Sequence, residues 1–362
     1  MTGMELKRKF IRLDAGKNPA LTHTKKRIQW VRLVNRSSWL YAGAVLASLF
    51  IVRLGGDRWW LATVVMFGPR WAFALPLCVL IPTAIVIARK ALWPLAITLS
   101  VVLVPLMGFC LPWRPLIVSD RSVLRAEVAQ VRVLTCNIHF NQLDPEALCS
   151  LITQTEPDIV ALQGTSEKHK AIVFGEEKWN SCRDGELCLG SRYPIRKVKA
   201  ASEPIFKVGQ GALAHYDLEW PGGTIHFFNL HLASPRDGLR AVIYQPKTAP
   251  SLIQANSDLR RNQAEIVRTW TKEVGGSILM AGDFNTPPES TIHEEYWSTF
   301  GNAFEEAGFG WGHTYFTRWA AVRIDHQLGS PGWQCQRCWV GPKIGSPHRP
   351  VIADWMWTGP KD

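Results

Sequence analysis

Three apolar stretches near the amino terminus restrict what this chain can fold into. They run over Ser37–Leu54, Trp71–Ala88 and Ala91–Leu111, and each is close to the length of about 20 apolar residues that crosses the hydrocarbon core of a bilayer. Tryptophans cluster near their ends, as they do at membrane–water interfaces; these are Trp39, Trp59, Trp60, Trp71 and Trp93. The pattern predicts three transmembrane helices, with a buried helical hairpin of a soluble protein as the alternative.

The basic residues around these stretches predict an orientation. Residues 1–36 hold ten Lys or Arg against Glu5 and Asp14, without apolar periodicity, and are expected to form a solvated tail. Arg89 and Lys90 separate the second and third stretches. The positive-inside rule places the tail and this turn in the cytoplasm. We therefore expect an integral protein of a bacterial inner membrane or a plasma membrane, with its carboxyl domain on the periplasmic or extracellular side.

The chain then divides into an anchor over residues 37–112, a linker over residues 113–130 and an outer domain over residues 131–362. Within the anchor, Asp57, Arg58 and Arg70 interrupt a short apolar piece between the first two stretches. This pattern is typical of an interfacial helix rather than a crossing.

The net positive charge of the chain lies in residues 1–112, which comprise the basic tail and the anchor. Residues 1–112 hold 15 of the 41 Lys and Arg residues and three of the 30 Asp and Glu residues, so the 26 and 27 that remain nearly cancel. A protein that grips many phosphates concentrates its basic residues on the binding domain. The near-neutral domain therefore disfavours long nucleic acids, although Arg260, Arg261 and Arg268 on one expected helix form a candidate local patch.

The outer domain contains a strand that ends in polar residues. In SILMAGDFNTPP, Ser277 to Pro288, the apolar run predicts a buried strand, and two prolines stop it. Asp283 and Asn285 are two residues apart, so both side chains would leave the same face of an extended chain. Their oxygens suit a hard cation, a phosphate or an attacking water, and an Asp-x-Asn turn is the alternative.

Five further motifs accompany this strand. They are VRVLTCNIHF with Asn137, PDIVALQGTSE, IHFFNLHL with His231, RIDHQL with Asp325, and SPHRPVIADW with His348. In order and spacing, Val131 to Trp357 resembles the endonuclease/exonuclease/phosphatase superfamily, whose members hydrolyse phosphoesters. The resemblance implies an α/β (α+β) fold, a four-layer sandwich of two mixed β-sheets flanked by helices, here preceded by three transmembrane helices.

The resemblance also implies catalytic roles. Asp283 matches the acid that orients or deprotonates the nucleophile, and Asn285 matches its amide companion. His348 matches the histidine that contacts the scissile phosphate, and Asp325 the carboxylate that fixes its ring. His231 matches a second histidine, which binds phosphate or acts as an acid.

The implied cofactor is a divalent cation, Mg²⁺ or Mn²⁺. Asn137 matches an amide that touches both phosphate and metal, and Asp283 would be a second ligand. The family glutamate that holds the cation is replaced by Gly164, and the acid that precedes the last histidine by Pro347. Because magnesium prefers anionic oxygens, we expect the ion to be weakly bound or absent. Glu167 and His139 are the candidate substitute ligands.

Two functions are open at this point. The first is a membrane-anchored phosphodiesterase or phosphatase-like hydrolase that uses in-line water attack on a lipid head group, a nucleotide or a nucleic acid. Its other partner would be the lipid bilayer, through the three helices, and no protein partner is expected. The alternative is a catalytically silent domain of the same fold that binds a phosphate ligand or takes part in an interaction, because Gly164 and Pro347 replace two carboxylates.

The remaining expectations concern local structure. Two cysteine pairs, Cys182/Cys188 and Cys335/Cys338, lie in loop-like sequence and suit disulfides of an oxidising compartment better than half of a zinc knuckle. Strands are expected over residues 132–138, 158–162, 187–191, 212–218, 224–232, 322–328 and 351–357, and helices over residues 143–153, 258–273 and 290–299.

Overall fold

Two six-stranded β-sheets form the carboxyl-terminal domain of the computed structural model, which describes residues 19–112, 130–139, 143–175, 177–201, 205–206 and 210–359. The first sheet has the order β13 (Trp333–Val340), β14 (Val351–Trp357), β1 (Gln130–Asn137), β2 (Ile159–Gln163), β4 (Leu187–Ser191), β3 (Asn180–Asp184). The second has the order β5 (Ile195–Ala200), β6 (Ala212–Trp220), β7 (Gly223–His231), β8 (Ile278–Asp283), β12 (Asp325–Gly329), β9 (Gly301–Asn302). Strands β1 and β2 run parallel, as do β7 and β8, while the other neighbours are antiparallel.

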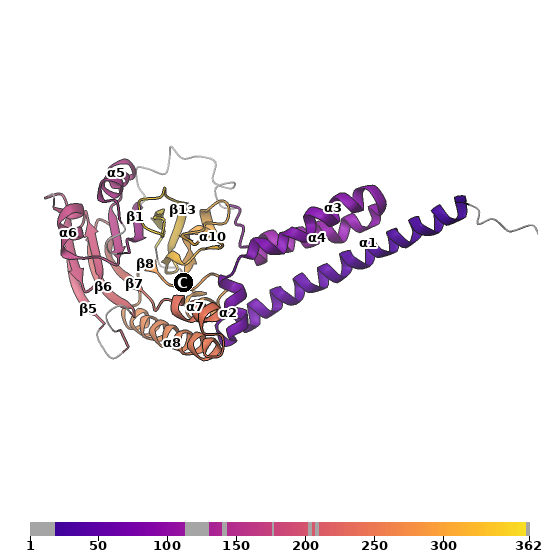
Figure 1. Ribbon diagram of the computed structural model, residues 1–362. Helices are drawn as coiled ribbons and strands as arrows, with labels where there is room; N and C mark the ends of the chain where they lie inside the picture. The colour runs from indigo at the N-terminus through magenta and orange to yellow at the C-terminus, as the bar shows by residue number, and fades with distance from the viewer. Residues whose placement is uncertain are drawn as a thin grey trace, which may run out of the picture.

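The two sheets pack face to face with helices outside. Alternate strand residues such as Val133, Ile159, Tyr216 and Phe227 fill the core between the sheets. The first sheet is covered by α5 (Pro145–Thr155) and α6 (Glu167–Phe174), and the second by α8 (Ala249–Val274) and α9 (Thr291–Trp297). The expected four-layer sandwich of two mixed sheets is therefore confirmed (Figure 1).

Shorter elements complete the domain. Helix α7 (Arg236–Tyr244) precedes α8, α10 (Ala303–Ala307) packs on β13, and β10 (Tyr315–Phe316) pairs with β11 (Ala321–Val322). Helix α5 begins where expected because Asp144 accepts hydrogen bonds from the backbone N–H groups of Glu146 and Ala147.

Some elements differ from the sequence expectation. Helix α8 begins at Ala249 rather than near residue 257, because Pro250 lies in its first turn, where proline is tolerated. Strand β13 was not expected, since a register shift between Cys335 and Arg337 breaks the two-residue alternation. The single strand expected over 322–328 is two separate pieces, β11 and β12.

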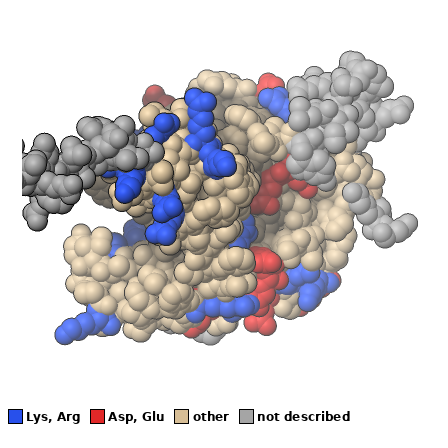
Figure 2. Space-filling view, turned by 90° about the vertical axis from the view of Figure 1, so that its right-hand side faces the viewer, with Lys and Arg blue, Asp and Glu red and all other residues tan. Residues whose placement is uncertain are grey.

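The anchor consists of α1 (Pro19–Phe50), α2 (Trp60–Phe67), α3 (Leu75–Ile87) and α4 (Leu92–Val101). Three helical segments, Lys25–Arg58, Arg70–Ile87 and Arg89–Leu106, are long and apolar enough to cross a membrane. Figure 1 shows α1 and the α3–α4 hairpin extending from one side of the domain, with the start of α1 and the α3–α4 turn at the far end. Seen from that end, most of the facing surface is uncharged, with isolated basic side chains (Figure 2).

The basic tail is shorter than expected. Residues 19–36 belong to α1, although their sequence shows no apolar periodicity. Lys, Arg, Gln and Leu are good helix formers, so the apolar helix continues toward the amino terminus. Residues 1–18 and the linker over 113–129 lie outside the described residues.

Two buried ion pairs join the anchor to the domain. Asp57, between α1 and α2, lies 3.2 Å from Arg260 of α8, and neither side chain is exposed. Asp57 also accepts a hydrogen bond from the Ser290 hydroxyl. Arg70, just after α2, lies 2.8 Å from Glu289, also buried. We call these two pairs the anchor junction.

The carboxyl-terminal end of the anchor, around Cys110, also contacts the domain. Cys110 and Gly310 exchange two backbone hydrogen bonds of 2.8 and 3.0 Å. The Trp71 indole donates to the Trp319 carbonyl at 2.8 Å. The anchor is therefore packed on the domain directly, and Asp57 and Arg70 are buried partners of that contact instead of charges at a membrane interface.

Arg260 is also not part of a nucleic-acid patch, because its side chain is fully buried against Asp57. None of the eight cysteines, all of which lie among the described residues, forms a disulfide, so the expected pairs Cys182/Cys188 and Cys335/Cys338 are not formed.

Candidate active site

Asp283 lies at the centre of the candidate site, at the carboxyl end of β8. Its carboxylate is 1% exposed, and its strand pairs with β7 on one side and β12 on the other, placing Asp283 beside His231 and Asp325. The preceding Gly282 is required here, because a Cβ atom would lie 1.9 Å from the Leu230 carbonyl oxygen. The sheet register thus brings three motif residues to one point.

Asp325 holds His348 through a buried hydrogen bond. The Nδ1 atom of His348 lies 2.9 and 3.1 Å from the two carboxylate oxygens of Asp325. Its Nε2 atom lies 3.8 Å from Asp283 Oδ2. Burial alone lowers the pKa of His348, but the Asp325 and Asp283 carboxylates outweigh it and raise this pKa above its ordinary value.

His231 has a carboxylate partner of its own, Glu186. The Nδ1 atom of His231 lies 2.7 Å from Glu186 Oε1, and its Nε2 atom lies 3.5 Å from Asp283 Oδ2. Burial lowers the pKa of His231, but Glu186 and Asp283 raise it to about 9. His231 is therefore an imidazolium at neutral pH, with Nε2–H directed toward the site.

Two amides complete the centre. Asn137, at the end of β1, donates from Nδ2 to Asp283 Oδ2 at 2.9 Å, and its Oδ1 accepts from the His139 backbone N–H. Asn285 donates its backbone N–H to Asp283 Oδ1 and its side-chain amide to the Leu232 carbonyl. Its φ of +49° is a left-handed conformation that asparagine tolerates. Asn285 therefore positions Asp283.

The pKa of Asp283 is raised above its ordinary value. Burial is the main cause and the nearby Asp325 carboxylate adds to it, while His348, His231 and the hydrogen bond from Asn137 act in the opposite direction. A raised pKa makes a carboxylate a better proton acceptor. Asp283 is thus a base surrounded by groups that compensate its charge.

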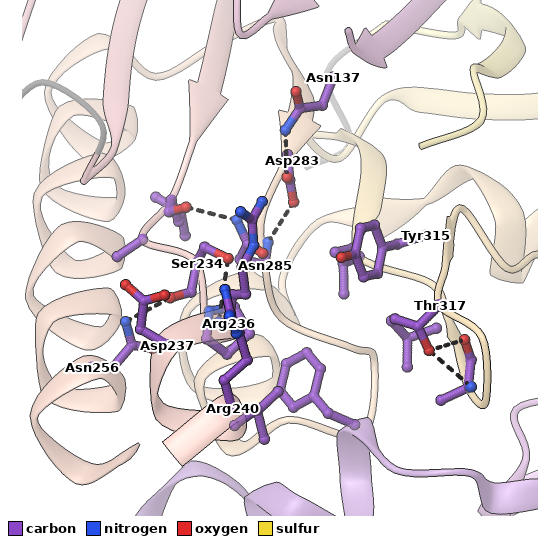
Figure 3. A pocket seen from close by; sticks show the side chains of 18 of the residues that line it. Asn137, Ser234, Arg236, Asp237, Arg240, Asn256, Asp283, Asn285, Tyr315 and Thr317 are labelled. Carbon is purple, nitrogen blue, oxygen red and sulfur yellow. Dashed lines mark hydrogen bonds between the residues drawn. The ribbon is translucent and has the colours of Figure 1, made fainter. Parts of the chain in front are cut away.

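A cavity of about 930 Å³ opens onto these groups. Figure 3 shows Asn137, Asp283 and Asn285 along one line, Arg236 and Arg240 below them, and Tyr315 and Thr317 on the opposite wall. The Tyr315 ring packs on His348 with 4.8 Å between ring centroids. The site is open to a molecule larger than a phosphate ion.

Comparison with known proteins identifies the family of this chain. The endonuclease/exonuclease/phosphatase family profile matches residues 134–348. The chain belongs to this family. Solved structures are similar to this chain at low identity: the match to a family protein from Bacteroides thetaiotaomicron has 15% identity, covers 64% of this chain and 99% of that protein, and has a TM-score of 0.48.

Two further structures are similar to this chain. A family protein from Bacteroides vulgatus is 18% identical, covers 63% of this chain and 99% of its own, and has a TM-score of 0.47. The match to humanized D. rerio TDP2 has 15% identity, covers 62% of this chain and 98% of that protein, and has a TM-score of 0.48. No curated protein matches the chain.

Members of the family generally hydrolyse phosphoesters with a divalent metal ion, and Asp283, Asp325 and His348 here bring possible ligand atoms within 4.8 Å of one another. These residues do not fit a resident Mg²⁺. Both oxygens of Asp325 already face His348 Nδ1, and both oxygens of Asp283 accept N–H groups. Mg²⁺ is usually held through one or two carboxylates, and each oxygen of these two carboxylates already has an N–H partner.

The region around Gly164, where the family has its metal-binding glutamate, has no room for a side chain at that position. Gly164 has φ +65°, and a Cβ atom there would lie 2.9 Å from Asn137 Oδ1, so a longer side chain does not fit without a shift. Glu167, a predicted substitute ligand, is absent from the cavity wall and is 74% exposed, paired with Arg183 at 2.9 Å. That prediction is wrong because α6 directs Glu167 outward.

His139, the other substitute, does line the cavity. Its Nε2 lies 2.8 Å from Arg236 Nη2. Burial and the Arg236 charge lower the pKa of His139. The space beside Gly164 therefore holds a neutral imidazole and a guanidinium, a positive group in the region where the family places a cation.

Sequence reasoning missed Glu186, Arg236 and Tyr315. Glu186 is the second residue of the two-residue turn Gly185–Glu186 between β3 and β4, and a Gly-X pair is a hairpin signal. That hairpin could have been found from this signal, and it would have placed Glu186 at a sheet end. Arg236 and Tyr315 lie in segments without such a signal.

Proposed function

We propose that this protein is a membrane-anchored phosphoester hydrolase that works without a resident Mg²⁺ ion. The observation that carries the proposal is the convergence of Asp283, His231–Glu186 and His348–Asp325 on one open cavity. An isolated structural histidine does not need a buried carboxylate partner, whereas two paired histidines around a raised-pKa acid are an arrangement for proton transfer.

The reaction follows from these groups. The phosphoryl oxygens contact Asn137 Nδ2 and His348 Nε2, which offset their negative charge. Asp283 takes a proton from a water as its oxygen bonds to phosphorus. The bond from phosphorus to the leaving oxygen breaks on the opposite side, and His231 donates its Nε2 proton to that oxygen. Water and phosphoester thus become an alcohol and a phosphate.

Arg236 supplies further positive charge. Its guanidinium contacts His139 beside Gly164 and lines the same cavity. Arginine is charged at every accessible pH and binds phosphate oxygens in a fork geometry. It can therefore take over the charge-balancing role of a cation, but with no activated metal-bound water.

The test uses the full chain in lipid nanodiscs and 4-nitrophenyl methyl phosphate as a chromogenic phosphodiester. We expect hydrolysis that persists in EDTA and disappears in His348→Ala. The matched control is Glu167→Ala, which removes an exposed carboxylate outside the cavity. Activity that EDTA abolishes and Mg²⁺ restores would contradict the metal-free mechanism. No turnover with Mg²⁺, Mn²⁺ or EDTA would favour the silent phosphate-binding domain.

The orientation is part of the proposal. The start of α1 and the α3–α4 turn lie at one end of the anchor, away from the domain (Figure 1). Both carry Lys and Arg, which supports a cytoplasmic position for that end and an exoplasmic one for the domain. Glu167→Cys, on an exposed side chain, should react with an impermeant maleimide in intact cells; labelling only after lysis would reverse the orientation.

A further inference from the structure

The cavity has two chemically different parts. Its inner end is the polar centre around Asp283. Toward the outside its wall is apolar, and the side chains come from the anchor helix α2 as well as from the domain; they are Val64 and Phe67 of α2, Leu239, Val242 and Ile243 of α7, and Leu259 of α8. A phosphate ion needs none of these residues.

Helix α2 is held in this position by the anchor junction. Asp57–Arg260 lies just before the helix and Arg70–Glu289 just after it, and all four side chains are buried. Gly68 and Pro69, at the end of α2, also line the cavity. The wall is therefore a fixed part of the site rather than a loose tether lying across it.

The surroundings of the wall are suited to a membrane surface. Trp71 follows the α2 segment and bonds to the Trp319 carbonyl, and both rings are exposed. On the other side, Ile243 and Tyr244 end α7 with exposed fractions of 76% and 72%. Exposed aromatic and aliphatic side chains of this kind are enriched at membrane–water interfaces.

Charge within the cavity matches an anionic group between these two parts. Arg236 and Arg240 extend from α7 below Asp283 and Asn285 (Figure 3). A molecule with a phosphoester at one end and hydrocarbon at the other would satisfy both parts at once. A nucleotide would leave the apolar wall against its sugar and base edges.

We propose that the substrate is a phosphoester with a long hydrocarbon chain, taken from the membrane, and that its chain runs between α2 and α7. This proposal rests on the hydrolase function proposed above. Helix α2 is then a specificity element supplied by the anchor.

The experiment compares 4-nitrophenyl hexadecyl phosphate with 4-nitrophenyl methyl phosphate, using the full chain in nanodiscs of fixed lipid composition. We expect the hexadecyl ester to have the higher kcat/KM. Ile243→Asp places a charge on the wall at an exposed position, and Val64→Asp does so on α2 at a half-buried position. Each should lower the ratio of hexadecyl to methyl kcat/KM at least tenfold, and the melting temperature of each variant shows that it is folded.

Leu61→Asp is the matched control, because Leu61 is an exposed α2 residue that does not line the cavity. Partition of the hexadecyl ester into the nanodisc is the same for every variant, so the ratio of variant to wild type reports the protein alone. Equal losses in Leu61→Asp and the wall variants would overturn the proposal. So would hydrolysis of both esters with no chain preference, which leaves the hydrolase intact. Failure to hydrolyse either ester would overturn the hydrolase function, and this inference with it.

Discussion

Two buried networks of charge differ in what they can do. In the anchor junction each arginine meets a carboxylate, Arg260 with Asp57 and Arg70 with Glu289, and the pairs are sealed from solvent. In the catalytic centre, Asp283 meets histidines at 3.5 and 3.8 Å, and the groups border an open cavity. Arginine does not release its proton, whereas histidine does. The junction therefore fixes one arrangement, and the centre can exchange protons with a substrate.

The largest effect is expected at the centre. Asp283→Asn keeps the shape of the side chain but removes the proton acceptor, and general-base catalysis contributes about 10²–10⁴-fold. We expect kcat for 4-nitrophenyl methyl phosphate to fall by that factor. The melting temperature should fall modestly, because the new amide NH2 faces either Asn137 Nδ2 or the Asn285 backbone N–H, and a buried unsatisfied donor costs about 1–3 kcal/mol. A variant with full activity would show that the centre has no base at Asp283.

Substitutions in the anchor junction should change the stability of the protein. Asp57→Ala leaves Arg260 buried without its partner, which costs about 3–5 kcal/mol. Urea denaturation of the full chain in nanodiscs, followed by tryptophan fluorescence, should show a lower midpoint. The double variant Asp57→Ala with Arg260→Leu removes the unpaired charge and should recover part of the loss. An unchanged midpoint in Asp57→Ala would mean that the junction does not hold α2 on the domain.

Glu186→Gln tests the proton on His231. With Glu186 present the pKa of His231 is about 9, so the protonated form persists until the pH rises through that value. Removing the Glu186 carboxylate leaves only Asp283 and Asp325 to oppose the effect of burial, so this pKa falls. The alkaline limb of kcat should move to lower pH, with about a tenfold loss at high pH for each unit of pKa. Glu219→Gln, an exposed change on β6, is the control and should leave the profile in place.

The smallest effect is expected next to Asp57. Arg58 is 64% exposed and lies 3.8 Å from Glu295. Exposed pairs contribute about 0–1 kcal/mol, so Arg58→Ala should change the urea midpoint little and leave activity unaltered. A loss as large as that of Asp57→Ala would show that burial is not what separates the two neighbours.

The same two regions show what sequence can predict. Asn137, His231, Asp283, Asp325 and His348 lie at strand ends within ordered motifs, and sheet register brings strand ends together. Their convergence could therefore be predicted, as could the four-layer fold and the three apolar helices.

The junction could not be predicted in this way. Asp57 and Arg260 are 203 residues apart in the chain, Arg70 and Glu289 are separated about as far, and each of the four residues resembles an ordinary surface charge. Their partners depend on how α2 docks against α8, a tertiary contact that leaves no periodicity in the sequence. The prediction that Glu167 is a metal ligand was wrong for a different reason. Glu167 is close to Gly164 in the sequence, but this closeness does not determine which side of α6 it occupies.

The anchor contacts the domain at two places, through Arg70 and through the Cys110–Gly310 backbone pair. These contacts have a kinetic consequence. With its helices in a bilayer, the catalytic cavity stays at a constant height above the lipid plane. For the membrane phosphoester proposed above, encounters would occur by lateral diffusion in two dimensions. Turnover should then follow the mole fraction of that substrate in the membrane and be insensitive to dilution of the surrounding buffer.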